Sequence, residues 1–155
     1  MPAPSAEPAA PPVDEAIATV EQQFGLLIET ARASLRAHAL KVHPQLQPVG
    51  YRVAALLVRR GPLHAAEVAE LLSTDKSLVS RTVKQLEELG MLVRQPDPAD
   101  RRASYLVATA EAVRRFDELH AADRAALYER MRGWAPDEVR QLARLLEKLN
   151  TTFAD

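Results

Sequence analysis

A run of cationic, hydroxyl and amide side chains in the middle of the chain has the residue types that recognise nucleic-acid bases. Arginine donates two hydrogen bonds to guanine, and glutamine pairs in a similar way with adenine. These side chains fall on one side of a helix expected from about Asp75 to Gly90: Lys76, Ser77, Ser80, Arg81, Lys84 and Gln85. Because a helix fits the major groove of DNA, this pattern indicates base reading.

The ends and the buried side of this helix also follow from its residue types. Asp75 can cap the helix, because its carboxylate accepts hydrogen bonds from free amides of the first turn. Gly90 can end it, because glycine tolerates the left-handed conformation. The apolar residues expected to face the core lie three or four apart, at Leu78 or Val79, Val83, Leu86 and Leu89. The hydroxyl of Thr82 is expected to contact phosphates or bases.

A second basic group follows in a polar loop. Two short strands are expected at about 91–95 and 103–108, and the loop 96–102 joins them. The loop ends in Arg101 and Arg102, and a basic hairpin of this kind can follow the DNA backbone or enter the minor groove. The hairpin would form a wing beside the helix.

The charge of the chain gives this interpretation little support by itself. The formal net charge is −1, and residues 73–102 hold six basic and five acidic side chains. A DNA-binding protein needs positive charge on one face rather than in total, so the prediction depends on where the cations lie. An alternative therefore stays open, in which a winged helix binds a ligand or a protein and does not contact DNA.

The elements that position these residues are mainly helical. Apolar residues recur every three or four positions from 13 to about 43, where His43-Pro44 ends the helix. Further helices are expected at about 49–60, 64–72, 110–132 and from Pro136 onward. The fold class is therefore mainly α with a small β-hairpin. Two short helices, a tight turn and a hairpin form a winged helix-turn-helix within 46–109.

The first twelve residues differ from the rest in composition. They contain five prolines and four alanines. Proline removes a backbone donor and clashes with the preceding turn, so residues 1–12 are expected to form a disordered or extended arm. Residues 13–155 are expected to form one domain.

Two stretches of the sequence resemble one known family. Residues 63–90 (LHAAEVAELLSTDKSLVSRTVKQLEELG) are similar to the DNA-reading core of multiple-antibiotic-resistance (MarR-type) regulators. Residues 97–111 (DPADRRASYLVATAE) are similar to their wing and the start of the next helix. The resemblance implies a transcriptional regulator, most often a repressor, that binds a pseudo-palindromic operator in double-stranded DNA as a homodimer. Helices 13–43 and 110–155 would form the dimer interface.

The resemblance also assigns roles to single positions. The reading-helix positions match Asp75, Leu78, Ser80, Arg81 and Gln85, and the wing-tip arginine matches Arg102. Asp100 would brace the wing by pairing with Arg94 or Arg102. Where the family usually has a glycine this chain has Ala112, which implies a straighter start of that helix and no loss of function.

Apolar stripes at the two ends of the chain support the dimer independently. They run along 13–35 and 139–153, with Leu145 or Leu146 in the second stripe. A monomer would leave part of this surface exposed, and large apolar patches usually mark interfaces. A twofold dimer would hold two reading helices about 34–36 Å apart, one turn of DNA. The alternative is that both helices pack on their own domain.

A small aromatic or phenolic effector is a further implication of the resemblance. It would bind between the dimer helices and the DNA-binding part, in a pocket lined by Phe24, Leu27, His38, His43, Val49, Tyr51 and Arg52. His38 and His43 could orient an anionic ligand. Their five-residue spacing does not suit one helical face, so ordinary surface or helix-end roles stay open.

Several chemistries are excluded by what the sequence lacks. The absence of cysteine excludes disulfides, zinc–thiolate sites and thiol nucleophiles. The four histidines lack metal-binding spacing, and there is no glycine-rich phosphate loop or Gly-x-Ser-x-Gly motif, so no metal, cofactor or enzymatic activity is expected. No apolar run could span a membrane and no signal peptide is visible, which predicts a cytoplasmic protein.

Overall fold

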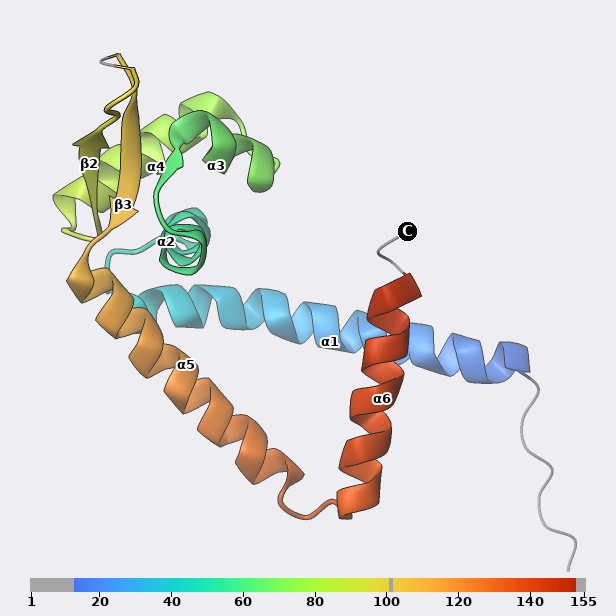
Figure 1. The fold of residues 1–155 in the computed structure, drawn as a ribbon. Coiled ribbons are helices and arrows are strands. Elements are labelled where there is room, and N and C mark those ends of the chain that lie inside the picture. The colour runs from blue at the N-terminus through green and yellow to red at the C-terminus, as the bar shows by residue number, and fades with distance from the viewer. Residues whose placement is uncertain (1–12, 101, 153–155) are drawn as a thin grey trace, which may run out of the picture.

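Six helices and three short strands make up the part of the chain that the computed structural model describes, residues 13–100 and 102–152 (Figure 1). They are α1 (Val13–Val42), α2 (Pro48–Arg60), β1 (Leu63–His64), α3 (Ala65–Leu71), α4 (Lys76–Glu88), β2 (Leu92–Pro96), β3 (Ser104–Ala108), α5 (Ala110–Met131) and α6 (Pro136–Thr152). The predicted helices and the predicted hairpin are present, with ends within one or two residues of those expected. The expected N-terminal arm, Arg101 and residues 153–155 lie outside the described residues.

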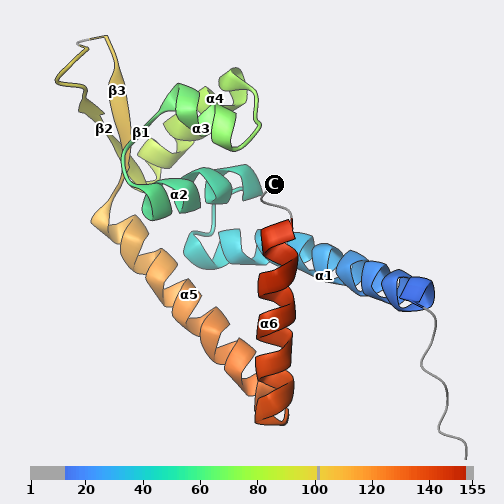
Figure 2. The ribbon, with the colours of Figure 1, turned by 45° about the vertical axis from the view of Figure 1, so that its right-hand side comes forward.

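The middle of the chain folds into a lobe from which the long helices extend. α2, α3, α4 and the strands lie together where α1 and α5 meet, and α6 turns back from the far end of α5 toward α1 (Figures 1 and 2). We call residues 39–119 the lobe. Residues 13–38, 120–131 and 136–152 are called the arms.

The buried core belongs entirely to the lobe. The buried apolar side chains of the described residues all lie between Ala39 and Leu119. Those on α2 and α4 recur three or four apart, as an amphipathic helix requires: Val53, Ala54, Leu56 and Leu57, then Val79, Val83 and Leu86. Each fully buried valine or leucine among them contributes about 1.5–3 kcal/mol. The lobe therefore holds most of the hydrophobic stabilisation.

The beginning of α5 is anchored in this core. Phe116 is fully buried, and its ring centroid lies 5.1 Å from that of Tyr51 on α2. Ala112 is also fully buried at the first turn of α5. The start of α5 thus moves with the lobe.

An antiparallel sheet in the order β1-β3-β2 lies beside the helices of the lobe. The predicted hairpin pairs Leu92 of β2 with Ala108 of β3. The sequence does not predict β1, which pairs Leu63 with Leu106, because two residues after Pro62 cannot show an alternating pattern. β1 ties the chain just before α3 to the hairpin.

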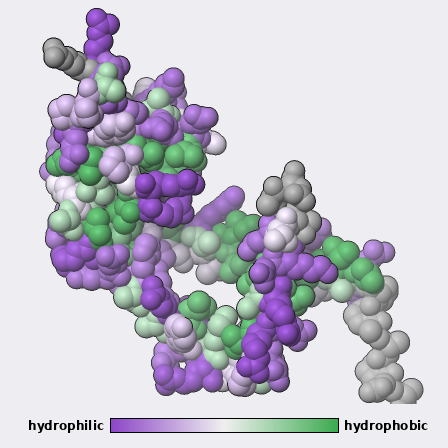
Figure 3. Space-filling model, in the orientation of Figure 1, coloured by the Kyte–Doolittle hydropathy of each residue, from purple (hydrophilic) through white to green (hydrophobic). Residues whose placement is uncertain are grey.

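The arms expose apolar side chains instead of burying them. No described side chain of the arms is buried, and Figure 3 shows hydrophobic residues gathered along α1. The exposed apolar residues include Ile17, Val20, Leu27 and Ile28 on α1, Leu127 and Tyr128 on α5, and Leu145 and Leu146 on α6. None of the helices in the described ranges is long and apolar enough to cross a membrane.

Candidate nucleic-acid interface

Asp75 is the N-terminal cap of α4, as predicted. Its Oδ1 accepts hydrogen bonds from the Ser77 hydroxyl and from the backbone N–H groups of Leu78, at 3.1 Å, and Ser77, at 2.8 Å. The Ser77 hydroxyl and these two amides hold the pKa of Asp75 below its usual value, because each bond favours the ionised carboxylate. The cap fixes the start of α4 next to its first exposed side chains.

The outer face of α4 carries the side chains expected to read bases. Its exposed residues are Lys76, Ser77, Leu78, Ser80, Arg81, Lys84 and the acidic Glu88. Of the two candidates for the first core position, Val79 is 1% exposed and Leu78 is 37% exposed, so Val79 faces the core. Thr82 is 4% exposed. The prediction that its hydroxyl contacts DNA is wrong, because position 82 lies on the buried side of the helix.

Gln85 lies at the edge of this face rather than within it. Its side chain is half-buried, and Nε2 donates a hydrogen bond to the carbonyl of Gln45, at 3.2 Å. Gln45 belongs to the loop between α1 and α2. This contact joins α4 to that loop, so a base contact by Gln85 has to replace it.

The turn between α3 and α4 is fixed from α2. Arg52 donates from its guanidinium to the carbonyl of Leu72, at 3.1 Å, and the Thr74 hydroxyl donates to the same carbonyl, at 3.0 Å. Ser73 has a φ of 48°, a left-handed conformation that a tight turn requires. Arg52, which is also one of the residues expected in the effector pocket, therefore supports the helix-turn-helix.

The wing places Arg102 on the surface at the end of the hairpin loop. Asp100 Oδ1 accepts a hydrogen bond from the backbone N–H of Arg102, at 2.9 Å. Asp100 thus braces the wing through the backbone and not through the Arg102 guanidinium. The alternative pairing with Arg94 is also wrong, because Arg94 Nε lies 3.0 Å from Glu87 Oε1 on α4. The predicted contact residue Arg101 lies outside the described part of the chain.

The base of the wing contains a polar cluster that sequence reasoning missed. His64 Nε2 lies 3.2 Å from Asp97 Oδ2, and His64 Nδ1 lies 3.2 Å from the carbonyl of Ser104. The imidazole also stacks on Tyr105, with ring centroids 4.2 Å apart. Asp97 is 8% exposed, which is low for a charged residue. No short-range pattern could reveal this cluster, because its members come from separate segments.

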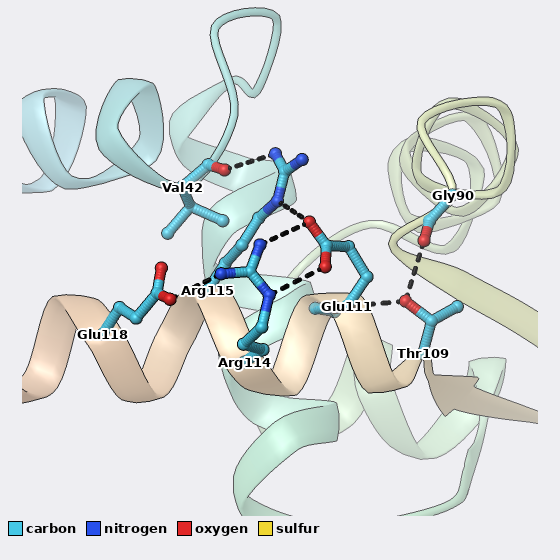
Figure 4. A network of polar contacts seen from close by, with 8 residues as sticks. Val42, Gly90, Thr109, Glu111, Arg114, Arg115 and Glu118 are labelled. Carbon is cyan, nitrogen blue, oxygen red and sulfur yellow. Dashed lines mark hydrogen bonds and ion pairs between the residues drawn. The ribbon is translucent and has the colours of Figure 1, made fainter.

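The junction between α4, the wing and α5 is held by Thr109 (Figure 4). The Thr109 hydroxyl donates to the carbonyl of Gly90, at 2.8 Å, and accepts from the backbone N–H of Ala112, at 3.1 Å. The Thr109 backbone N–H donates to the carbonyl of Met91, at 3.1 Å. Thr109 is therefore both the N-terminal cap of α5 and a link to the end of α4.

An ion-pair network on α5 extends this junction to α1 (Figure 4). Arg115 donates to Glu111 Oε1, at 2.6 Å, and to the carbonyl of Val42 at the end of α1, at 2.9 Å. Hydrogen bonds from Arg114 and Arg115 lower the pKa of Glu111 to about 2. The Glu111 carboxylate thus holds the arginine that connects α5 to α1.

The residues expected to line an effector pocket fall into separate groups within one chain. Phe24 and Leu27 line an open apolar hollow of about 240 Å³ against Leu142 and Leu146 of α6. His43 accepts a hydrogen bond from the Gln45 backbone N–H, at 3.2 Å, which is a helix-end role.

The remaining pocket candidates lie where α1, α2 and α5 meet. The ring centroids of His38 and Tyr51 are 6.2 Å apart, and His38 Nε2 lies 3.3 Å from Asp123 Oδ1. Burial raises the pKa of Tyr51, and the Asp123 carboxylate raises it further. Val49, two residues before Tyr51 on α2, is half-buried. Across the described ranges, no cluster of three histidine or acidic side chains could hold a metal ion.

The fold of the lobe is a winged helix-turn-helix, because α3 and α4 are adjacent, α4 has an exposed outer face and the hairpin forms a wing beside it. Residues 45–103 match the model of the MarR family. The HTH-type transcriptional regulator YwoH of Bacillus subtilis is 32% identical over 99 residues, 61% of this chain and 72% of YwoH. The HTH-type transcriptional repressor MdtR of the same organism is 26% identical over 132 residues, 79% of this chain and 85% of MdtR.

A solved structure shows the same fold over nearly the whole chain. A MarR family protein from Bacillus stearothermophilus superposes with a TM-score of 0.79 at 17% identity, and the match covers 92% of this chain and 98% of that protein. The chain belongs to the MarR family of HTH-type transcriptional regulators. Regulators of this family bind DNA, typically as dimers, and are not enzymes.

Proposed function

We propose that this regulator is a repressor that binds a pseudo-palindromic operator as a homodimer and leaves it when a small aromatic effector binds. The observation that carries the proposal is the exposed row on α4, with Arg81 and Lys84, next to the exposed Arg102 of the wing. In this arrangement Arg81 and its neighbours on α4 contact bases in the major groove. Arg102 contacts the backbone or the minor groove.

The contacts proposed for the reading helix divide by side-chain chemistry. Arg81 reads guanine, and the exposed Leu78 packs on a thymine methyl group. The phosphates are bound by Lys76, Ser77, Ser80, Lys84, Arg101 and Arg102. Asp75 acts through its cap, and Gln85 reads adenine after releasing Gln45.

The proposed dimer rests on the arms. Exposed apolar side chains lie on all three arm helices, and α6 contributes no described buried side chain to its own chain. Pairing of helices 13–43 and 110–155 with those of a second copy would cover this surface, since patches of this kind mark interfaces. The twofold axis then holds two α4 helices about 34–36 Å apart, matching half-sites one DNA turn apart.

The repressor role is supported by the named repressor MdtR, which aligns with most of this chain. The effector role is supported by the position of Tyr51, half-buried between the rings of His38 and Phe116 where the arms join the lobe. A ligand that packs there contacts both parts of the molecule. Phe24 and Leu27 would contact an effector only at the separate hollow against α6.

Binding-site selection followed by gel shifts tests the DNA-binding part of the proposal. We expect a twofold-symmetric site, two chains per site, and an affinity that falls as salt rises, because cations on α4 and the wing replace counterions at phosphates. An asymmetric site bound by one chain contradicts the dimer. An absent or salt-insensitive shift instead favours a winged helix that binds a ligand or a protein.

A panel of phenols and benzoates tests the effector part. We expect at least one compound to raise the melting temperature of the free protein and to release the operator, with both effects weakened by His38→Gln. The matched control is Asp117→Asn, at an exposed position of α5. If no compound releases the operator, the aromatic-effector proposal is wrong. If Asp117→Asn weakens the response as much as His38→Gln does, the proposed site is wrong.

A further inference from the structure

The carbonyl at the end of α1 is bound by a side chain of α5. Val42 is the last residue of α1, and the last carbonyls of a helix have no amide partner within it. Arg115 Nη1 donates a hydrogen bond to the Val42 carbonyl, at 2.9 Å. A cation also suits this position, because the C-terminal end of a helix carries partial negative charge. Arg115 thus caps α1 from another helix.

Arg115 is also held from its other side (Figure 4). Its Nε donates to Glu111 Oε1, at 2.6 Å, one turn earlier on α5. Arg114 binds both oxygens of the same carboxylate, at 2.8 and 3.0 Å, and so fixes Glu111. A guanidinium is planar and its donors point in fixed directions. Because Glu111 holds one edge of this plane, the other donors of Arg115 are directed at the end of α1.

The bond lies where α1 and α5 meet at the lobe. Val42 and Ala39 are buried, whereas no described side chain of α1 before Ala39 is buried, and the two helices separate beyond this point (Figures 1 and 2). A second polar contact, between His38 Nε2 and Asp123 Oδ1, lies further out at 3.3 Å. Helix packing alone leaves crossing angles scattered by about 15–20°. A hydrogen bond weakens as its donor turns away from the acceptor, so the Arg115 bond narrows the range of angles.

This angle sets where the lobe sits relative to the arms. Thr109 joins the start of α5 to the end of α4, so the lobe follows the start of α5. In the proposed dimer the arms pair and each lobe carries one α4 helix. The angle at Arg115 therefore determines the separation of the two α4 helices, which has to match half-sites about 34–36 Å apart.

We propose that Arg115 is a positioning residue: it fixes the angle between α1 and α5, and with it the half-site spacing that the dimer recognises. The spacing rests on the proposed dimer, whereas the angle is a property of one chain. Arg115→Met removes both hydrogen bonds and keeps an apolar stem. The matched control is Arg114→Met, because the ion pairs of Arg114 with Glu111 and Glu118 lie within α5.

A distance within one chain gives the first test. Because the chain has no cysteine, Glu21→Cys and Glu70→Cys provide spin-label sites at exposed positions of α1 and α3. An excess of unlabelled chain ensures that double electron–electron resonance measures distances within one chain, whether or not the chains pair. Residue 21 lies about 30 Å along α1 from Val42, so a change of about 10° in the angle moves its label by about 5 Å.

We expect a narrow distance distribution for the parent and for Arg114→Met, and one broadened or displaced by about 5 Å for Arg115→Met. Circular dichroism checks that each variant is folded. Arg115→Lys keeps the charge but lacks the planar group that makes both bonds, so it should broaden the distribution less, and it decides the result if Arg115→Met does not fold. The proposal is wrong if the Arg115 variants match the parent, or if Arg114→Met broadens the distribution as much.

Operator spacing gives the second test. One base pair is added or removed between the half-sites of the selected site, and fluorescence anisotropy measures the affinity. We expect either change to weaken binding by the parent about fivefold or more and binding by Arg115→Met about twofold or less, because a flexible dimer spares the DNA the deformation. Arg114→Met should behave like the parent. A base change within a half-site should cost the parent and Arg115→Met the same, since α4 is unchanged.

The two tests distinguish this inference from the proposed function. If the parent binds as one chain or has no preference for spacing, the proposed dimer on a twofold operator is wrong, and the distance within one chain decides the role of Arg115. If that distance changes as expected but Arg115→Met keeps the spacing penalty of the parent, Arg115 fixes the angle and the inferred link to half-site spacing is overturned.

Discussion

The lobe and the arms use the same apolar residue types in opposite ways. In the lobe, Leu57 is 1% exposed and Phe116 is fully buried, whereas in the arms Leu127 is 52% exposed and Tyr128 is 70% exposed. Both regions consist of helices with periodic apolar residues. The difference is that the helices of the lobe pack on each other and on a sheet, while every described side chain of the arm helices stays at least partly exposed.

This difference indicates where each kind of substitution acts. A change in the core of the lobe alters the folding of one chain, because the neighbours that cover the side chain belong to that chain. A change on the arms alters association, if a second copy covers them as proposed. Stability and assembly can therefore be changed separately, and the following predictions test that separation.

Phe116→Ala should have the largest effect on folding. Truncating a fully buried phenylalanine costs about 3–5 kcal/mol, because it removes apolar contacts and leaves a cavity. Urea unfolding followed by circular dichroism measures the loss. Asp117→Ala, at the exposed neighbouring position, should cost little. Equal losses for the two variants would contradict the assignment of the start of α5 to the core of the lobe.

Leu146→Glu should act on assembly instead. Leu146 is 43% exposed, so a glutamate is tolerated in one chain but is costly in an apolar dimer interface. We expect the dimer dissociation constant to rise by roughly 100-fold, as about 3 kcal/mol implies. Analytical ultracentrifugation measures it. Gln141→Glu adds the same charge at an exposed polar position of α6. If both variants remain dimers, α6 is not the interface.

Arg81→Ala and Arg102→Ala should change DNA binding in different ways: the first should alter sequence specificity and the second the overall affinity. Loss of a bidentate hydrogen bond to guanine costs about 1–3 kcal/mol of discrimination at one base pair. Arg81→Ala should therefore relax specificity at that base pair. Arg102→Ala should weaken all sequences alike and lower the salt dependence by about one phosphate contact. Fluorescence anisotropy on the selected site and its single-base variants separates the two. Both substitutions should leave the dimer intact.

Asp75→Asn should have the smallest effect, a slight loss of stability that is present at neutral pH and disappears in acid. Because the folded-state pKa of Asp75 lies below its ordinary value of 3.8, its stabilising contribution is present above about pH 4 and is lost as the pH falls through the lowered pKa. Asparagine is also a good cap but does not titrate in this range. Thermal melts should therefore show a small advantage for the parent at neutral pH that disappears in acid. Parallel acid profiles would contradict this.

Much of the fold could be predicted because it depends on short-range patterns. The period of the apolar residues locates each helix, Asp75 and Thr109 mark two helix starts, and the shift in period locates the hairpin. The ambiguous choice between Leu78 and Val79 shows the limit of periodicity. Adjacent apolar residues are distinguished only by what packs on them.

The parts that could not be predicted depend on contacts between distant segments. Gln85 bonds to Gln45, and His64 pairs with Asp97, because the fold brings α4 to the α1–α2 loop and β1 to the wing. The pocket candidates fall into separate groups for the same reason. Positions on one helix, such as Phe24 and His38, have different neighbours from other elements.

The bonds at Thr109 and Arg115 make α5 a rigid lever. The helix has 22 residues, which gives a length of about 33 Å. Its first turns are fixed to the end of α4 and to α1, so a shift of about 3 Å at the far end tilts it by about 5° and turns the lobe with it. In a twofold assembly the change in spacing between the two α4 helices is doubled. Stacked bases lie about 3.4 Å apart, so in the proposed dimer a repacking between the arms would change how well the two α4 helices match their half-sites.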